Sequence, residues 1–176
     1  MGSYTLAVSV TVLSVASFLI YPSSGVSHDI LTTICSKTQN HDACERSLES
    51  DSRTRSADLP KLSLISIELT MKQADHNHRT FSDLRDNATD PRLEDSFRNC
   101  VGFYKEMQAQ IRAAYHLSQK RQYQKITELV QSERLAQECA SGIPINCLEI
   151  DALTTTMLLA IKTSESVNQY IAKSLA

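Results

Sequence analysis

Between residues 91 and 115, apolar side chains recur at the three- or four-residue spacing that places them on one face of an α-helix. A helix with an uncovered apolar face has little stability of its own in water, so other elements of the chain must cover this stripe. The pattern therefore predicts packing between helices. The stripe consists of Leu93, Phe97, Cys100 or Val101, Tyr104, Met107 or Gln108, Ile111 and Tyr115.

Three further segments, residues 59–84, 123–136 and 150–175, carry apolar residues at a similar period and are joined by short links. The chain has only four glycines, and no run of useful length alternates between polar and apolar residues as a strand would. Four amphipathic helices with short links bury their stripes against one another in an antiparallel arrangement. The sequence predicts an all-α protein, an antiparallel up-and-down four-helix bundle preceded by a short helical hairpin at residues 28–50.

Residues near the expected helix ends indicate where the helices begin. Asp58 and Asp90 each precede a proline that falls in the first helical turn, so each aspartate is expected to cap a helix. Asn146 and Glu149 have the spacing of a capping box before the last helix. Gly102 lies inside the second helix, where we expect it to permit a close crossing of two helices.

The first 27 residues contain no Asp, Glu, Lys or Arg, and an apolar run from Leu6 to Ile20 is followed by small residues. This pattern is typical of a cleaved secretory signal peptide, and the run is shorter than the roughly 20 residues of a membrane-spanning helix. We expect residues 1–27 to be a signal peptide, cleaved after Gly25 or Ser27. Residues 28–176 would then form a single secreted domain that does not associate with a membrane.

The 18 basic and 20 acidic residues give a formal net charge of −2, which does not favour nucleic-acid binding. No glycine-rich phosphate loop, nucleophile elbow or His-Glu-x-x-His motif occurs. His76 and His78 lie two positions apart, so they point roughly 200° away from each other on a helix. We expect no catalytic residue, no metal site and no cofactor, and a protein that is not an enzyme.

Secretion determines what the five cysteines are expected to do, because exported thiols are normally oxidised. Two disulfides with one cysteine left over is the natural count, and spacing alone does not fix the pairing. The simplest pairing joins Cys35 to Cys44 and Cys100 to Cys139, and an alternative joins Cys100 to Cys147.

Four stretches of the chain resemble, in order, the motifs of one family. "ICSKTQNHDACERSL" at 34–48 is similar to a first cysteine motif, and "TRSADLPKLSLISIEL" at 54–69 to a first bundle helix. "SFRNCVGFYKEMQAQI" at 96–111 resembles the stretch with the third cysteine, and "DALTTTMLLAI" at 151–161 the last helix. The chain thereby resembles the plant invertase and pectin methylesterase inhibitor family, and "NCVGFY" is similar to its pollen-type invertase inhibitors.

The resemblance implies disulfides between Cys35 and Cys44 and between Cys100 and Cys139, with Cys147 as a free thiol. It also implies a function. The protein would dock one-to-one on a secreted plant enzyme, an acid invertase or a pectin methylesterase of the cell wall or vacuole, and cover its active-site cleft. The Pro-Lys-Phe motif of many invertase inhibitors would fall at residues 121–123, where it is absent, so the target enzyme stays open.

We expect the partner to contact the turn between the second and third bundle helices, with Lys120, Arg121, Tyr123 and Gln124 as candidate contacts. Asn87 begins an Asn-Ala-Thr sequon in an expected loop and is a candidate glycosylation site. The alternative function is that of a secreted signalling or structural helical bundle without an enzyme target.

Overall fold

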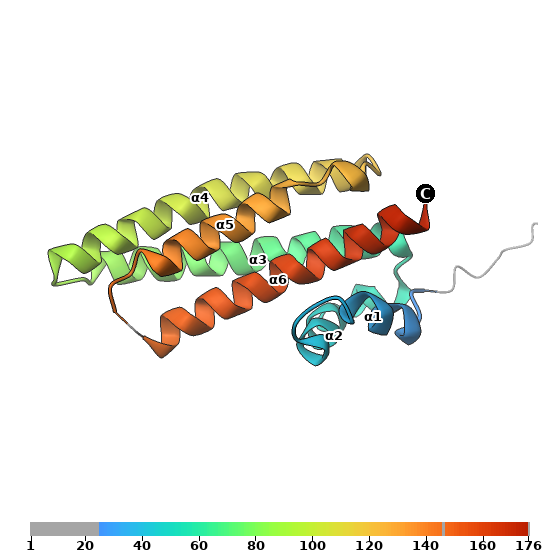
Figure 1. Ribbon diagram of the computed structural model, residues 1–176, viewed down its shortest axis with the longest axis horizontal. Coiled ribbons are helices and arrows are strands. Elements are labelled where there is room, and N and C mark those ends of the chain that lie inside the picture. The colour runs from blue at the N-terminus through green and yellow to red at the C-terminus, as the bar shows by residue number, and fades with distance from the viewer. Residues whose placement is uncertain (1–24, 146, 176) are drawn as a thin grey trace, which may run out of the picture.

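A computed structural model describes residues 25–145 and 147–175 of the chain, and this part is all-helical. Figure 1 shows four long helices packed along one another, with a short hairpin of two helices against one side. The predicted four-helix bundle with an N-terminal hairpin is confirmed. The hairpin helices are α1 (His28–Cys35) and α2 (His41–Glu49), and the bundle helices are α3 (Leu59–Asp86), α4 (Pro91–Gln119), α5 (Glu128–Ser141) and α6 (Leu148–Ser174). Two 3-10 turns, η1 (Ser52–Ser56) and η2 (Tyr123–Lys125), precede α3 and α5.

Two predicted caps define the starts of α3 and α4. The carboxylate of Asp58 accepts the backbone N–H of Lys61 at 2.9 Å, and that of Asp90 accepts the N–H of Arg92 at 2.8 Å. Each cap satisfies one of the backbone N–H groups that have no partner within a first helical turn. Both expected caps are therefore confirmed.

Three local predictions need correction. The third bundle helix begins at Glu128 instead of residue 123, because a 3-10 turn and two further residues intervene. Cys147 is the N-cap of α6 and makes no side-chain cap hydrogen bond, while Asn146, the expected cap, lies outside the described residues. Gly102 is exposed, and a Cβ there would meet no atom within 4 Å, so this glycine does not mediate a helix crossing.

Most of the predicted signal peptide, residues 1–24, lies outside the described residues. The three residues that follow are described and contact the domain. The N–H of Val26 donates to the carbonyl of Ala57 at 2.7 Å, and Ser27 is the N-cap of α1. No helix within the described part of the chain is both long enough and apolar enough to cross a bilayer.

The buried apolar residues form two clusters along the length of the bundle. One lies among all four bundle helices and includes Phe81, Phe97, Tyr104 and Met157. The other joins the hairpin to α3 and α6. Its members on these helices are Leu31, Ile34, Cys35, Cys44, Leu48, Leu62, Ile65, Val167 and Ile171, with Ala57 and Tyr123 beside them.

Buried polar side chains join α3 to its neighbours α4 and α6. The hydroxyl of Ser63 lies 2.6 Å from both the Ser118 hydroxyl and the Asn168 carboxamide oxygen. Farther along α3, Thr70 lies 2.7 Å from the Ser164 hydroxyl. Since a buried polar group without a partner is costly, these pairs fix the register of α6 against α3.

Candidate functional site

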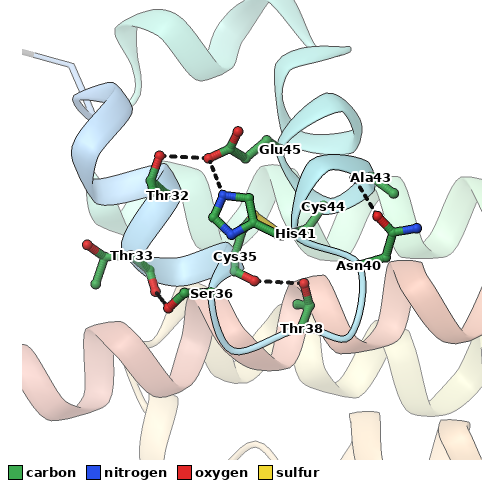
Figure 2. Close-up of a disulfide and its surroundings, with 10 residues drawn as sticks. All are labelled: Thr32, Thr33, Cys35, Ser36, Thr38, Asn40, His41, Ala43, Cys44 and Glu45. Carbon is green, nitrogen blue, oxygen red and sulfur yellow. Dashed lines mark hydrogen bonds and ion pairs between the residues drawn. A yellow bond between two sulfur atoms is a disulfide. The ribbon is translucent and has the colours of Figure 1, made fainter.

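The N-terminal hairpin is closed by a disulfide between Cys35, the last residue of α1, and Cys44 in α2 (Figure 2). Both cysteines are buried, and their Cα atoms lie 5.6 Å apart. Glu45 adds a second link, because its carboxylate accepts the Thr32 hydroxyl at 2.7 Å and lies 3.0 Å from His41 Nε2. The Thr32 hydrogen bond, followed by the charge of His41, lowers the pKa of Glu45.

The hairpin lies against the C-terminal half of α6. Leu31 and Ile34 of α1 and Leu48 of α2 belong to the same buried cluster as Val167 and Ile171 of α6. The disulfide and the Glu45 hydrogen bond therefore hold together two short helices that present one apolar face to the bundle.

A second disulfide joins Cys100 of α4 to Cys139 of α5, with their Cα atoms 4.8 Å apart. Cys147 belongs to neither disulfide, and it is partly buried against the large cluster that contains both of these cysteines. The structure thus has the pairing that the resemblance implies, and not the alternative between Cys100 and Cys147.

The expected glycosylation site lies at the turn between α3 and α4. Asn87 is the C-cap of α3 and is exposed, and its side-chain amide donates to the carbonyl of Asp83 at 2.7 Å. Thr89, the third residue of the sequon, is exposed as well.

The four candidate partner contacts lie where α4 leads into η2, at the opposite end of α4 from Asn87. Lys120, Arg121 and Gln124 are exposed, whereas Tyr123 is only 5% exposed and belongs to the hairpin cluster. The structure therefore places three of the four side chains on the surface and the fourth beneath them.

Arg121 adopts a left-handed backbone conformation, with φ at 56°. It follows the C-cap Lys120, and the N–H of Gln122 donates back to the carbonyl of Leu117 at 2.9 Å. Helices often end with such a residue, but it is usually glycine, because a side chain is strained there. The chain thus turns sharply away from α4 and projects a cation at the turn.

A pocket of about 190 Å³ lies beside this turn. Four of its residues, Gln122, Lys125, Ala172 and Leu175, were not predicted from the sequence. The last two lie at the end of α6, which is far from the turn in the sequence and close to it only in the folded protein. Lys125 next to the expected contacts was a signal in the sequence, whereas Leu175 after α6 gave none. The lining residues are Arg121, Gln122, Tyr123, Gln124, Lys125, Ala172 and Leu175.

The hydroxyl and imidazole side chains of α3 are not assembled into a reactive site in the described part of the chain. Ser63 and Ser66 are buried in hydrogen bonds within the bundle, and His76 is exposed on α3. Across residues 25–145 and 147–175, no three His, Cys, Asp or Glu side chains gather as a metal ion would require. What the structure offers for recognition is an exposed, rigidly held surface.

The described elements define a class of protein, a disulfide-linked four-helix bundle that carries a helical hairpin at its N-terminal end. The family model described as plant invertase/pectin methylesterase inhibitor matches residues 29–176. The chain therefore belongs to this family, as the motifs in its sequence predicted. At the level of the family, these proteins are inhibitors of plant invertases or pectin methylesterases.

One curated relative is consistent with this assignment. A pectinesterase inhibitor of Actinidia deliciosa is 29% identical over 103 residues, which are 58% of this chain and 56% of that protein. The match thus spans a little over half the length of this curated relative.

Two solved structures are similar to this chain in fold. Mutant form A of a pectin methylesterase inhibitor from Arabidopsis has a TM-score of 0.70 and 18% identity, and the match covers 79% of this chain and 95% of that one. A pectin methylesterase inhibitor from Arabidopsis thaliana has a TM-score of 0.61 and 16% identity, with 83% and 98% covered. At such identities the likeness concerns the fold alone.

Proposed function

We propose that the protein is a secreted inhibitor that docks one-to-one on an acid invertase or a pectin methylesterase and blocks entry to the active-site cleft. The observation that carries this proposal is the match of residues 29–176 to a family of such inhibitors. The disulfide-held bundle supports it, because a rigid surface loses little conformational entropy on binding. The cell wall is the proposed site of action, and the vacuole is a second compartment in which such enzymes act.

The proposed contact surface is the α4–α5 side of the bundle, with Lys120, Arg121 and Gln124 at its end. A standard interface buries about 800 Å² on each partner, which two bundle helices can supply. Tyr123 contributes from below by supporting the turn, because its ring belongs to the buried hairpin cluster. Charged side chains at the edge of such a surface mainly affect the association rate and the choice of partner.

The direct test titrates the secreted protein against both enzyme types at a mildly acidic pH. We expect stoichiometric loss of either sucrose cleavage or pectin demethylation. Exchanging Lys120 and Arg121 for glutamate should weaken the inhibition about tenfold or more through charge reversal at the contact. The same reversal at the exposed residues Lys37 and Arg46 of the hairpin end is the matched control.

The proposal fails if neither enzyme loses activity at an inhibitor concentration well above that of the enzyme. Recovery of a membrane receptor in place of either enzyme from a cell-wall extract would instead favour a signalling ligand. If the Lys120/Arg121 variant and the Lys37/Arg46 variant both inhibit as well as the unchanged protein, the enzyme contact lies elsewhere on the bundle.

We also propose secretion with removal of the signal peptide and glycosylation of Asn87. Cleavage after Gly25 leaves the Val26 hydrogen bond and the Ser27 cap in the mature chain, whereas cleavage after Ser27 removes both. N-terminal sequencing of the exported protein should therefore give Val26 as the first residue. Treatment with an N-glycosidase should lower the mass of the unchanged protein and leave that of Asn87→Gln unaltered.

A further inference from the structure

The pocket beside η2 contains polar side chains that the rest of the chain leaves without partners. Among the described residues, no side-chain hydrogen bond or ion pair involves Arg121, Gln122, Gln124 or Lys125. Some cations elsewhere in the described chain are paired, for example Arg98 with Glu94 and Asp95, and Lys162 with Glu133 and Glu165. The pocket therefore brings together two cations and two carboxamides whose side chains are available to a ligand.

Tyr123 provides an independent observation at the same place. Its side chain lines the pocket and is 95% buried, and its hydroxyl is buried without a hydrogen-bond partner in the described structure. Burial raises the pKa of Tyr123, while the charge of Arg121 acts to lower it and that of Asp58 to raise it. The phenol stays protonated at physiological pH, so it is an available hydrogen-bond donor. Since buried polar groups are nearly always paired, an unpartnered donor on a side chain that lines a pocket favours a ligand or an ordered water at this place.

The backbone conformation of Arg121 is a further indication of a ligand site. Glycine is favoured at its left-handed position, and an arginine there strains the turn. The strain holds a guanidinium at the edge of the pocket. Strained residues of this kind tend to gather where ligands bind.

We propose that this pocket binds a carboxylated sugar unit of an acidic oligosaccharide. Arg121 and Lys125 would hold the carboxylate, and the carboxamides of Gln122 and Gln124 would pair with ring hydroxyls, which both donate and accept hydrogen bonds. Ala172 and Leu175 provide an apolar wall for the C–H face of a sugar ring. An acidic side chain of a partner protein would use the cations but leave both carboxamides and the Tyr123 phenol unpaired, so the set of groups fits a sugar acid better.

This inference does not depend on enzyme inhibition. The test measures binding of short oligogalacturonates to the secreted protein by calorimetry at low ionic strength, with the fully methyl-esterified oligomer and a neutral oligosaccharide of the same length for comparison. We expect the acidic oligomer alone to bind. Replacing Arg121 and Lys125 with glutamine should weaken that binding about tenfold, because two charge-assisted contacts are lost.

Two further variants distinguish binding at this pocket from nonspecific attraction of the acidic oligomer to positive charge. Lys37→Gln with Arg46→Gln removes the same charge from exposed, unpaired positions on the hairpin and should leave binding unchanged. Tyr123→Phe keeps the ring and removes only the hydroxyl, and it should weaken binding about threefold. Circular dichroism melts of each variant show whether it has folded.

Several outcomes would overturn the proposal. These are equal binding of the acidic and esterified oligomers, equal losses in the Arg121/Lys125 and Lys37/Arg46 variants, or no binding of any oligosaccharide. If the Arg121 and Lys125 substitutions weaken enzyme inhibition and leave oligosaccharide binding unaffected, the pocket is a protein contact and the inference is wrong. If oligosaccharide binding follows the predicted order and no enzyme is inhibited, the inference stands and the proposed function fails.

Discussion

Gly102 lies on the exposed face of α4, where an added Cβ would meet no other atom within 4 Å. Glycine in a helix loses more backbone entropy on folding than alanine does. Gly102→Ala should therefore raise the free energy of unfolding by about 0.5–1 kcal/mol. Urea denaturation monitored by circular dichroism measures this change. A decrease would mean that the glycine has a packing role that its surroundings in the structure do not indicate.

The left-handed backbone of Arg121 leads to a second prediction for a single residue. Arg121→Gly should raise the free energy of unfolding by about 1 kcal/mol, because glycine adopts this conformation without steric strain. The matched control is Arg112→Gly in the exposed interior of α4, which should lower it by about 1 kcal/mol. The same denaturation experiment serves both variants. A loss of stability in both would show that Arg121 makes stabilising contacts of its own.

Prediction from sequence works for single residues whose partners are local. Asp58 and Asp90 cap helices only three or two residues ahead, so their roles follow from spacing. Ser63 is different, because it bonds to Asn168, which lies 105 positions away in the chain. Only the packing of α6 on α3 makes this serine a buried hydrogen-bonding residue, and no local pattern contains that information.

Among the structural elements, the two disulfides should differ in their contribution to stability. The chain-entropy model gives about 2.7 kcal/mol for the hairpin disulfide and about 4 kcal/mol for the disulfide between α4 and α5. The difference arises from loop length, since the cysteines are 9 and 39 residues apart. Pairwise replacement with serine should lower the melting temperature more for Cys100 and Cys139 than for Cys35 and Cys44. The reverse order would show that the hairpin disulfide also holds α1 and α2 on the bundle.

The bounds of long helices were easier to predict than those of the turns between them. The predicted segment 59–84 agrees with the observed helix Leu59–Asp86, because a long apolar period fits few alternative helix bounds. The segment at 123–136 was placed too early, since Tyr123 and Ile126 are apolar and fit a helical spacing. In the structure Tyr123 is buried from a 3-10 turn, and helix α5 starts five residues later.

At the scale of the whole molecule, three carboxylates should contribute to how stability responds to acid. A hydrogen bond from Thr32 lowers the pKa of Glu45. Hydrogen bonds from Arg53 lower the pKa of Asp51, and a hydrogen bond from Arg85 lowers that of Asp86. A lowered folded-state pKa favours folding above the unfolded pKa, 4.5 for Glu and 3.8 for Asp, and this contribution disappears as the pH falls through the folded value.

Thermal melts from pH 7 to pH 2.5 test this effect. The contribution of these carboxylates should be constant above about pH 5 and should decline below about pH 4.5. In the variant that combines Glu45→Gln with Asp51→Asn, the melting temperature should fall less steeply over the acidic range. An unchanged slope would assign the acid sensitivity to other groups.

The fold could be predicted almost completely from sequence because apolar period, caps and cysteines all favoured one architecture. The candidate site could be predicted only in part. Lys120, Arg121 and Gln124 are polar residues within five positions of one another at a helix end, so their exposure could be predicted. Leu175 joins the pocket because the end of α6 packs beside the η2 turn, which is a property of the tertiary structure.

The attachment of the hairpin to α6 has a consequence for how the chain matures. Nascent polypeptides emerge with their N-terminal residues first, so α1 and α2 leave the ribosome well before Val167 and Ile171 are synthesised. Until α6 has been synthesised, the apolar face of the hairpin cannot pack against it. The disulfide between Cys35 and Cys44 joins residues only nine positions apart, so it can form before the rest of the chain is made. Its oxidation can therefore stabilise the hairpin before α6 is available.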